Sequence, residues 1–140
     1  MNLAKYIIIY SQMDGREGIS YVGLSRILFA LQYNFSRKYN YPLFFDSFYK
    51  NYYNIHSKKV YNKYGHYCAT NIYMSCVEKL PYLKLCKEDI NIINDIIEDG
   101  YDFSKTNSVA YKITNSEVWK QNENLSWREI RKRNIKEYEV

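Results

Sequence analysis

One run of apolar residues constrains the fold of this chain more than any other feature. Five of them recur at the spacing that places side chains on one face of an α-helix: Leu24, Ile27, Leu28, Leu31 and Phe35. Ser20 precedes the run and suits an N-cap, because its hydroxyl can accept an N–H of the first turn. Pro42 follows the run, and the residue before a proline avoids the helical conformation. The spacing therefore predicts a long helix that begins after Ser20 and ends near Asn40.

Similar stripes and capping residues predict further helices along the chain. Thr114 with Glu117, and Ser126 with Glu129, have the spacing of a capping box at a helix start. The expected helices, besides the long one, cover residues 2–13, 57–65, 67–80, 87–99, 106–113 and 126–138. Residues 43–55 are rich in Phe and Tyr, which also favour strands. We therefore expect one compact all-α domain over residues 1–140, of about six to eight helices, with at most a minor β element near residues 43–55.

The apolar faces of these helices define a predicted core. It comprises Leu3, Ile7, Leu24, Leu28, Leu31, Ile93, Ile97, Val109, Ile113 and Trp119. The predicted helix at 87–99 should end at Gly100, and it has acidic residues at both ends. Glu98 and Asp99 oppose the helix dipole at its C-terminus. This unfavourable end predicts a basic neighbour or partner.

The net charge of +5 is unevenly distributed along the 140 residues. Residues 37–67 are strongly basic, residues 88–102 are acidic without Lys or Arg, and residues 128–137 are basic again. Such segregation can steer a binding partner or self-association. The oligomeric state does not follow from it.

Hydropathy and cysteine content predict a cytoplasmic protein without a membrane segment. No run approaches the roughly 18 apolar residues that a transmembrane helix needs. The apolar run at residues 3–10 is short and lacks the basic start and cleavage site of a signal peptide. The three cysteines are odd in number and lack C-x-x-C spacing, which suits a reducing compartment.

Patterns for catalysis or cofactor binding are weak. His66 and Cys68 form one closely spaced pair that Cys76, Cys86 or His56 could complete as a zinc site. Structural zinc sites normally use two such pairs, so buried thiols at helical spacing explain the cysteines better. No base is placed beside a thiol as nucleophilic catalysis requires. The two glycines of residues 14–18 lack the Gly-Lys-Ser/Thr of a phosphate-binding loop. We therefore predict a protein that is not an enzyme and that holds no metal or cofactor.

Basic and aromatic residues alternate through residues 37–67, which leaves two kinds of partner open. Basic side chains can pair with phosphates while aromatic rings stack on bases, as in nucleic-acid binding. Tyrosine and tryptophan also dominate the energetic centres of protein interfaces. The 17 tyrosines cannot all fit a core of this size, so some must be exposed. The acidic segment 88–102 argues against a uniformly basic surface and favours a protein partner.

Several motifs resemble the Panacea domain family. The opening Leu3-Ala4-Lys5-Tyr6-Ile7-Ile8 is similar to the family's first helix. Gly18-Ile19-Ser20 followed by Leu24-Ser25-Arg26-Ile27-Leu28-Phe29 and Gln32-Tyr33 resembles its second helix, and Tyr41-Pro42-Leu43-Phe44 resembles the exit from that helix. Val60-Tyr61 with Tyr64-Gly65, and the C-terminal stretch to Trp119, also match. Two motifs depart from the pattern: Asn54-Ile55-His56 replaces a Gly-Pro-Val turn, and Thr114-Asn115 replaces Thr-His.

The resemblance implies a function in neutralising other proteins. Members of the family act mainly as antitoxins or adaptors in toxin–antitoxin operons, on phages and on other mobile elements. The chain is therefore expected to be an antitoxin-like inhibitor that binds one protein partner. A phage-encoded inhibitor of a host defence, such as an anti-CRISPR protein, and a nucleic-acid-binding protein are the alternatives.

The predicted contact surface centres on residues 49–67, where the family's turn is replaced and Tyr and Lys are densest. The basic outer face of the last helix is the second candidate. The predicted partner-binding residues are Tyr52, Tyr53, His56, Lys58, Lys59, Tyr64, Arg131 and Lys132.

Overall fold

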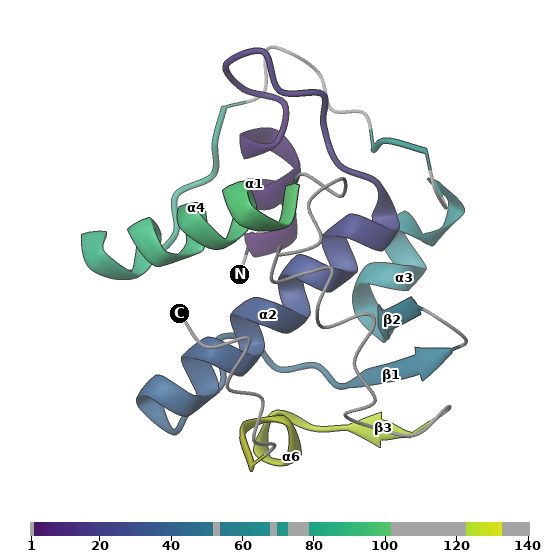
Figure 1. Ribbon diagram of the computed structural model, residues 1–140, viewed down its shortest axis with the longest axis vertical. Coiled ribbons are helices and arrows are strands. Elements are labelled where there is room, and N and C mark those ends of the chain that lie inside the picture. Colours follow the sequence, from purple (N-terminus) through teal and green to yellow (C-terminus); the bar gives the residue numbers. More distant parts are fainter. Residues whose placement is uncertain (1, 52–53, 68–69, 73–78, 102–122, 133–140) are drawn as a thin grey trace.

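The computed structural model describes residues 2–51, 54–67, 70–72, 79–101 and 123–132. Helices dominate this part of the chain, and a small antiparallel sheet accompanies them, so a mostly helical fold is confirmed (Figure 1). The helices are α1 (Leu3–Tyr10), α2 (Tyr21–Tyr39), α3 (Lys58–Tyr64), a 3-10 turn (Gly65–Tyr67), α4 (Lys87–Tyr101) and α6 (Trp127–Lys132). The strands are β1 (Phe48–Asn51), β2 (Asn54–Ser57) and β3 (Asn124–Leu125).

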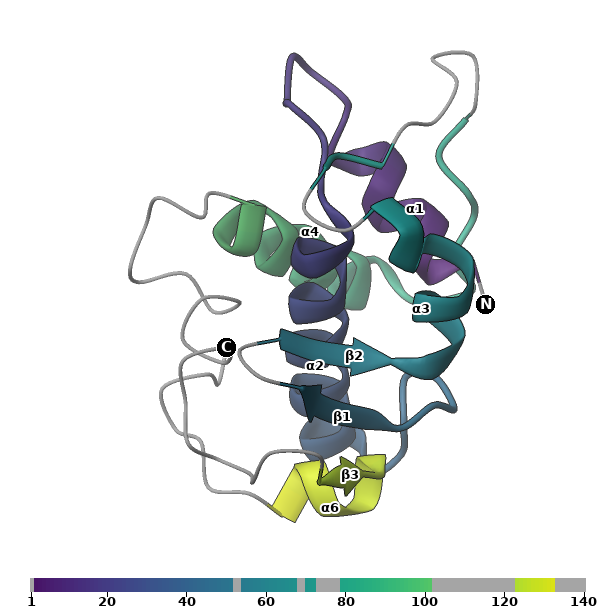
Figure 2. The same ribbon diagram turned by 90° about the vertical axis from the view of Figure 1, so that its right-hand side faces the viewer.

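Helix α2 runs through the centre of the molecule, as both views show (Figures 1 and 2). The hydroxyl of Ser20 accepts the N–H of Gly23 at 3.1 Å, which confirms the predicted N-cap. Asn40 ends the helix in the left-handed conformation, with φ of 52°, a conformation that asparagine tolerates better than most residues. All five residues of the predicted stripe are buried. The opposite side of the helix is buried too, at Phe29, Ala30 and Tyr33.

The three strands form a sheet with the order β2-β1-β3, and it packs against α2. Phe48 of β1 pairs with Ser57 of β2 and with Leu125 of β3. Its side chain is fully buried and meets Phe29 of α2 edge to face, with ring centroids 5.5 Å apart. The predicted β element near residues 43–55 is therefore present. Strand β3, which adds to the far side of β1, was not predicted.

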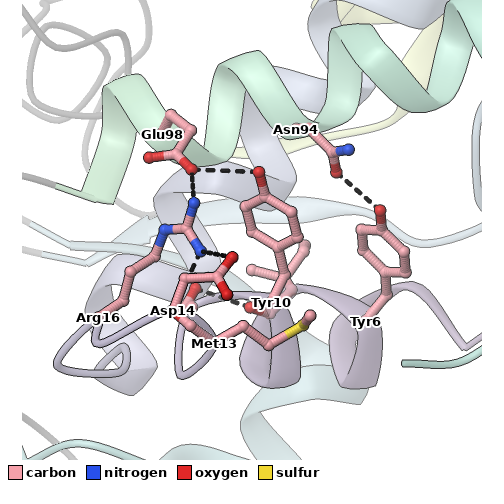
Figure 3. A network of polar contacts seen from close by, with 9 residues as sticks. Tyr6, Tyr10, Met13, Asp14, Arg16, Asn94 and Glu98 are labelled. Atoms are coloured by element: carbon pink, nitrogen blue, oxygen red, sulfur yellow. Dashed lines mark hydrogen bonds and ion pairs between the residues drawn. The ribbon is translucent and has the colours of Figure 1, made fainter. Parts of the chain in front are cut away.

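Helices α1 and α4 are joined by polar contacts (Figure 3). The hydroxyl of Tyr6 donates to Asn94 Oδ1 at 2.7 Å, and that of Tyr10 donates to Glu98 Oε1 at 3.1 Å. Arg16 forms an ion pair with Glu98, and its guanidinium lies 4.6 Å from the centroid of the Tyr10 ring. The basic neighbour predicted for the acidic end of α4 is thus Arg16.

Some predicted boundaries differ from the structure. Helix α1 ends at Tyr10 rather than Met13, because i→i+3 hydrogen bonds replace the α-helical pattern from Gln12 onward. Helix α4 continues through Gly100 to Tyr101, since glycine also adopts helical dihedral angles. The helix predicted at 67–80 is contradicted at residues 70–72, where Asn71 forms an isolated β-bridge with Ser20.

The predicted core is confirmed where the structure describes it. Seven of its residues are 3% exposed or less: Leu3, Ile7, Leu24, Leu28, Leu31, Ile93 and Ile97. Val109, Ile113 and Trp119 lie outside the described residues, as do the Thr114–Glu117 capping box and the helix predicted at 106–113. None of the described helices has both the length and the apolar character needed to cross a membrane.

Truncation of Leu31 should destabilise the protein strongly. Its side chain is fully buried in the central helix, and replacing a buried leucine with alanine typically costs about 2–5 kcal/mol of unfolding free energy. Chemical denaturation of Leu31→Ala and wild type measures the difference. Tyr82→Ala is the control, because that side chain is 84% exposed. A loss for Leu31→Ala no larger than for the control would contradict the central position of α2.

Candidate functional site

Two aromatic side chains project into solvent from the loop between α2 and β1. Tyr41 is 61% exposed and Phe45 is 63% exposed. Their rings contact each other edge to face, with centroids 5.9 Å apart and planes at 90°. Large aromatic side chains at this exposure contribute little to the folded core, and they are the residue types that dominate protein interfaces.

The buried side chain of Gln32 fixes the backbone of this loop to α2. Its Nε2 donates to the carbonyl of Phe44 at 2.6 Å, and its Oε1 accepts the N–H of Leu43 at 2.9 Å. Gln32 is fully buried, so both ends of its amide are satisfied by the loop rather than by water. The two exposed rings therefore project from a backbone that is held in place.

Asp46 fixes the other end of the loop to α3. One carboxylate oxygen accepts the N–H of Ser47 at 2.8 Å, while the other accepts the Ser57 hydroxyl and the N–H of Lys59 at 3.2 Å. Helix α3 begins after Ser57, as predicted, but the Ser57 side chain makes no capping bond. Asp46, which is distant in sequence, satisfies a first-turn N–H instead.

Helix α6 places an indole ring beside the loop. The rings of Tyr41 and Trp127 have centroids 6.4 Å apart. The guanidinium groups of Arg128 and Arg131 lie over the Trp127 ring, 5.1 and 5.9 Å from its centroid. Arg37 of α2 donates to the backbone carbonyl of Arg131 at 3.3 Å, which ties α6 to the central helix.

An apolar hollow lies beside the loop on the side of α1 and α3. Its volume is about 520 Å³, and Tyr41 and Phe45 form part of its wall. Leu3, Ala4, Leu28 and Val60 contribute from the three surrounding helices. A smaller hollow of about 260 Å³ lies between Tyr41, Tyr39 and Asp89. Tyr41, Pro42 and Leu43 line both hollows, so the loop divides them.

Two predicted contact segments meet at this loop. Lys59 lines the large hollow, and its Nζ donates to the carbonyl of Phe45 at 2.8 Å. Lys58 is exposed next to it, and Lys132 is exposed next to Arg131 on α6. We call the combined area the Tyr41 surface. Its residues are Tyr41, Phe45, Lys58, Lys59, Trp127, Arg128, Arg131 and Lys132.

Other predicted contact residues lie elsewhere. Tyr64 is only 6% exposed and belongs to the core, so the structure does not place it on the exposed surface where the sequence predicted it. Tyr52 and Tyr53 lie outside the described residues, and their predicted role stays a prediction. His56 is half-buried rather than openly exposed.

His56 lies in a cluster of tyrosine rings on one side of the sheet. Its Nδ1 is 2.7 Å from the hydroxyl of Tyr21, and its ring stacks on Tyr49 with centroids 5.0 Å apart. Tyr61 meets it edge to face. Burial lowers the pKa of His56 and raises the pKa of Tyr21 to about 12. Both rings are therefore neutral near pH 7, and the cluster is best explained as packing.

Potential catalytic and metal-binding groups are dispersed in the described part of the chain. Within it, no three His, Cys, Asp or Glu side chains are grouped to hold a metal ion. Cys86 is exposed, while Cys68 and Cys76 lie outside the described residues. Asp89, in the first turn of α4, is buried and accepts hydrogen bonds from the Tyr39 hydroxyl and from Lys38 Nζ, so its carboxylate joins α4 to α2.

The sequence did not single out Tyr41, Phe45 and Trp127 as candidate contact residues. The segment from Tyr41 to Phe45 did carry a signal, since consecutive aromatic residues follow a proline that ends a helix. The exposure of these rings depends on Gln32 and Asp46, however, and neither bond is evident from local sequence.

No protein-family model, curated protein or solved structure was found to match this chain.

Removal of the Asp46 carboxylate should loosen the loop and the start of α3. Asp46→Ala leaves the N–H of Lys59 and the buried Ser57 hydroxyl without their acceptor, which should cost about 1–2 kcal/mol of unfolding free energy. Asp46→Asn keeps one acceptor oxygen and should lose less. Chemical denaturation of the three proteins measures this order. Equal stability of Asp46→Ala and wild type would show that the carboxylate does not anchor the loop.

Acidification should destabilise the protein partly through His56. The folded state lowers the pKa of His56, so the unfolded chain binds its proton first, and stability falls as the pH drops through about 6.5. The fall in thermal midpoint between about pH 7.5 and 5.5 should be smaller for His56→Gln than for wild type. His66→Gln, which alters an exposed histidine, is the control. The same fall in His56→Gln and wild type would contradict the assignment.

Proposed function

We propose that this protein is a non-enzymatic, antitoxin-like inhibitor that neutralises one protein partner by binding it through the Tyr41 surface. The observation that carries the proposal is the pair of exposed rings, Tyr41 and Phe45, on a loop fixed at both ends. A fixed loop loses little conformational freedom on association, which leaves more of the interaction energy for affinity. Exposed aromatic residues on such a loop are the usual composition of an interface centre.

The resemblance to the Panacea family supports the same kind of activity. The motif similar to the family's helix exit, Tyr41-Pro42-Leu43-Phe44, supplies part of the loop. The motif around Val60-Tyr61 supplies one wall of the hollow. Proteins of that family neutralise partners by binding them, and the partner here is a toxin or a host-defence protein on this proposal. Arg131 and Lys132 are proposed contacts within the Tyr41 surface, and Tyr52 and Tyr53 remain proposed additional contacts.

Nucleic-acid binding is the second candidate, since basic side chains surround the exposed rings. Two features of the Tyr41 surface favour a protein instead. The ring of Trp127 already has two guanidinium groups over it, so its own arginines compete with a base for stacking. The hollow beside the loop is walled largely by aliphatic and aromatic side chains, which suit an apolar side chain better than a phosphate.

Photo-crosslinking in the native host tests the proposed function. A benzoylphenylalanine at position 41 or 45 should capture one protein, while the same group at Tyr82, which is also strongly exposed, should not. The double variant Tyr41→Ala with Phe45→Ala should lose the partner and keep the thermal midpoint of wild type. Co-expression with reading frames that neighbour its gene should identify one whose toxicity wild type relieves and the double variant does not. Equal capture at positions 41 and 82, or full neutralisation by the double variant, would contradict the proposal.

A further inference from the structure

Two charged side chains, Asp46 and Lys59, line the large hollow. The exposed Lys58 precedes Lys59 at the start of α3. The carboxylate of Asp46 already accepts three hydrogen bonds from its own chain. Lys59 uses one of its three donors on the carbonyl of Phe45, so its ammonium stays fixed at the wall of the hollow. The hollow therefore combines an apolar interior with a basic edge.

The size of the hollow suits a side chain of a partner. A cavity of about 150 Å³ is enough to hold a benzene molecule, and the hollow is larger, at about 520 Å³. Ala4 and Val60 contribute small side chains to its wall and so leave the space open. An apolar side chain that enters it is placed beside Lys59.

We infer that the hollow accepts an apolar or aromatic side chain of a partner protein whose neighbouring residues are acidic. The apolar side chain fills the space between Ala4, Leu28 and Val60, and the flanking carboxylates pair with Lys58 and Lys59. This inference rests on the proposed function and adds the chemistry of the segment that is recognised. Charge complementarity of this kind also speeds association and makes it sensitive to salt.

Short synthetic peptides test the inference with the full-length protein. The probe is a fluorescein-labelled peptide with the sequence Glu-Asp-Leu-Phe-Glu-Asp. Its comparison peptides replace Leu-Phe with Gly-Ser, or replace the four acidic residues with Lys. The first peptide should bind most tightly, weaken as salt is added, and shift the amide NMR signals of Ala4 and Val60. Equal binding of all three peptides, or shifts confined to other parts of the protein, would overturn the inference.

Two variants separate the basic edge from the apolar interior. Lys58→Glu with Lys59→Glu should weaken binding of the acidic peptide by about tenfold or more. Lys79→Glu with Lys84→Glu makes the same charge change outside the hollow and should have little effect on that binding. Ala4→Leu, which fills the hollow from α1, should weaken binding of the Leu-Phe peptide and leave the thermal midpoint of the protein close to that of wild type. Full peptide binding by both test variants would also overturn the inference.

The outcomes distinguish this inference from the proposed function. The double variant Tyr41→Ala with Phe45→Ala can lose partner binding while the variant Lys58→Glu with Lys59→Glu keeps it. In that case the surface binds a protein without recognising acidic residues. A labelled single-stranded oligonucleotide is the last probe. If the oligonucleotide binds, displaces the acidic peptide and no longer binds the variant Lys58→Glu with Lys59→Glu, the basic edge recognises phosphates and the inference is wrong.

Discussion

The burial of α2 on all sides is the constraint on which the rest of the structure depends. A helix with a single apolar face can leave its other face in water, but α2 is covered by the sheet, by α4 and by α6. Its polar residues Ser25, Gln32 and Ser36 are fully buried as a result. A buried amide is costly unless it is hydrogen-bonded, and Gln32 meets that need by bonding the backbone of the loop at Leu43 and Phe44. The position of the Tyr41 surface thus follows from the packing of the central helix.

Local sequence determines the parts of the fold that could be predicted. The stripe of α2 and its Ser20 cap depend on residues within a few turns of each other, and both were confirmed. The capping of α3 does not follow from local sequence. Ser57 precedes the helix without making a capping bond, and the acceptor for the N–H of Lys59 is Asp46, beyond the preceding hairpin. Strand β3 escaped prediction for a related reason. Its two residues have no strand pattern of their own and become a strand only by pairing with Phe48 and Tyr49.

The exposed aromatic surface was harder to predict than the fold, because a tyrosine has the same local signature whether it is buried or exposed. The density of Tyr and Lys indicated residues 49–67, yet Tyr64 lies in the core and His56 packs among Tyr21, Tyr49 and Tyr61. Charge was more informative than aromatic content. The acidic C-terminus of α4 correctly indicated a basic neighbour, and the basic segments at Lys58–Lys59 and Arg131 both reach the loop, through Phe45 and Trp127 respectively.

The bonds that hold the loop cost conformational entropy when the protein folds, whereas the exposed rings gain burial only when a partner binds. Gln32 and Asp46 order the loop in the free protein, and that order has an entropic cost of about 1–2 kcal/mol per residue. Tyr41 and Phe45 offset little of this cost, since more than half of each side chain stays in water. Full burial of a large apolar side chain is worth about 1.5–3 kcal/mol relative to full exposure, and the exposed part of each ring gains its share of that energy only when a partner covers it, with little further loss of backbone freedom. The arrangement thus gives its full benefit only in a complex, which is a physical reason to regard this loop as a binding element rather than a connection.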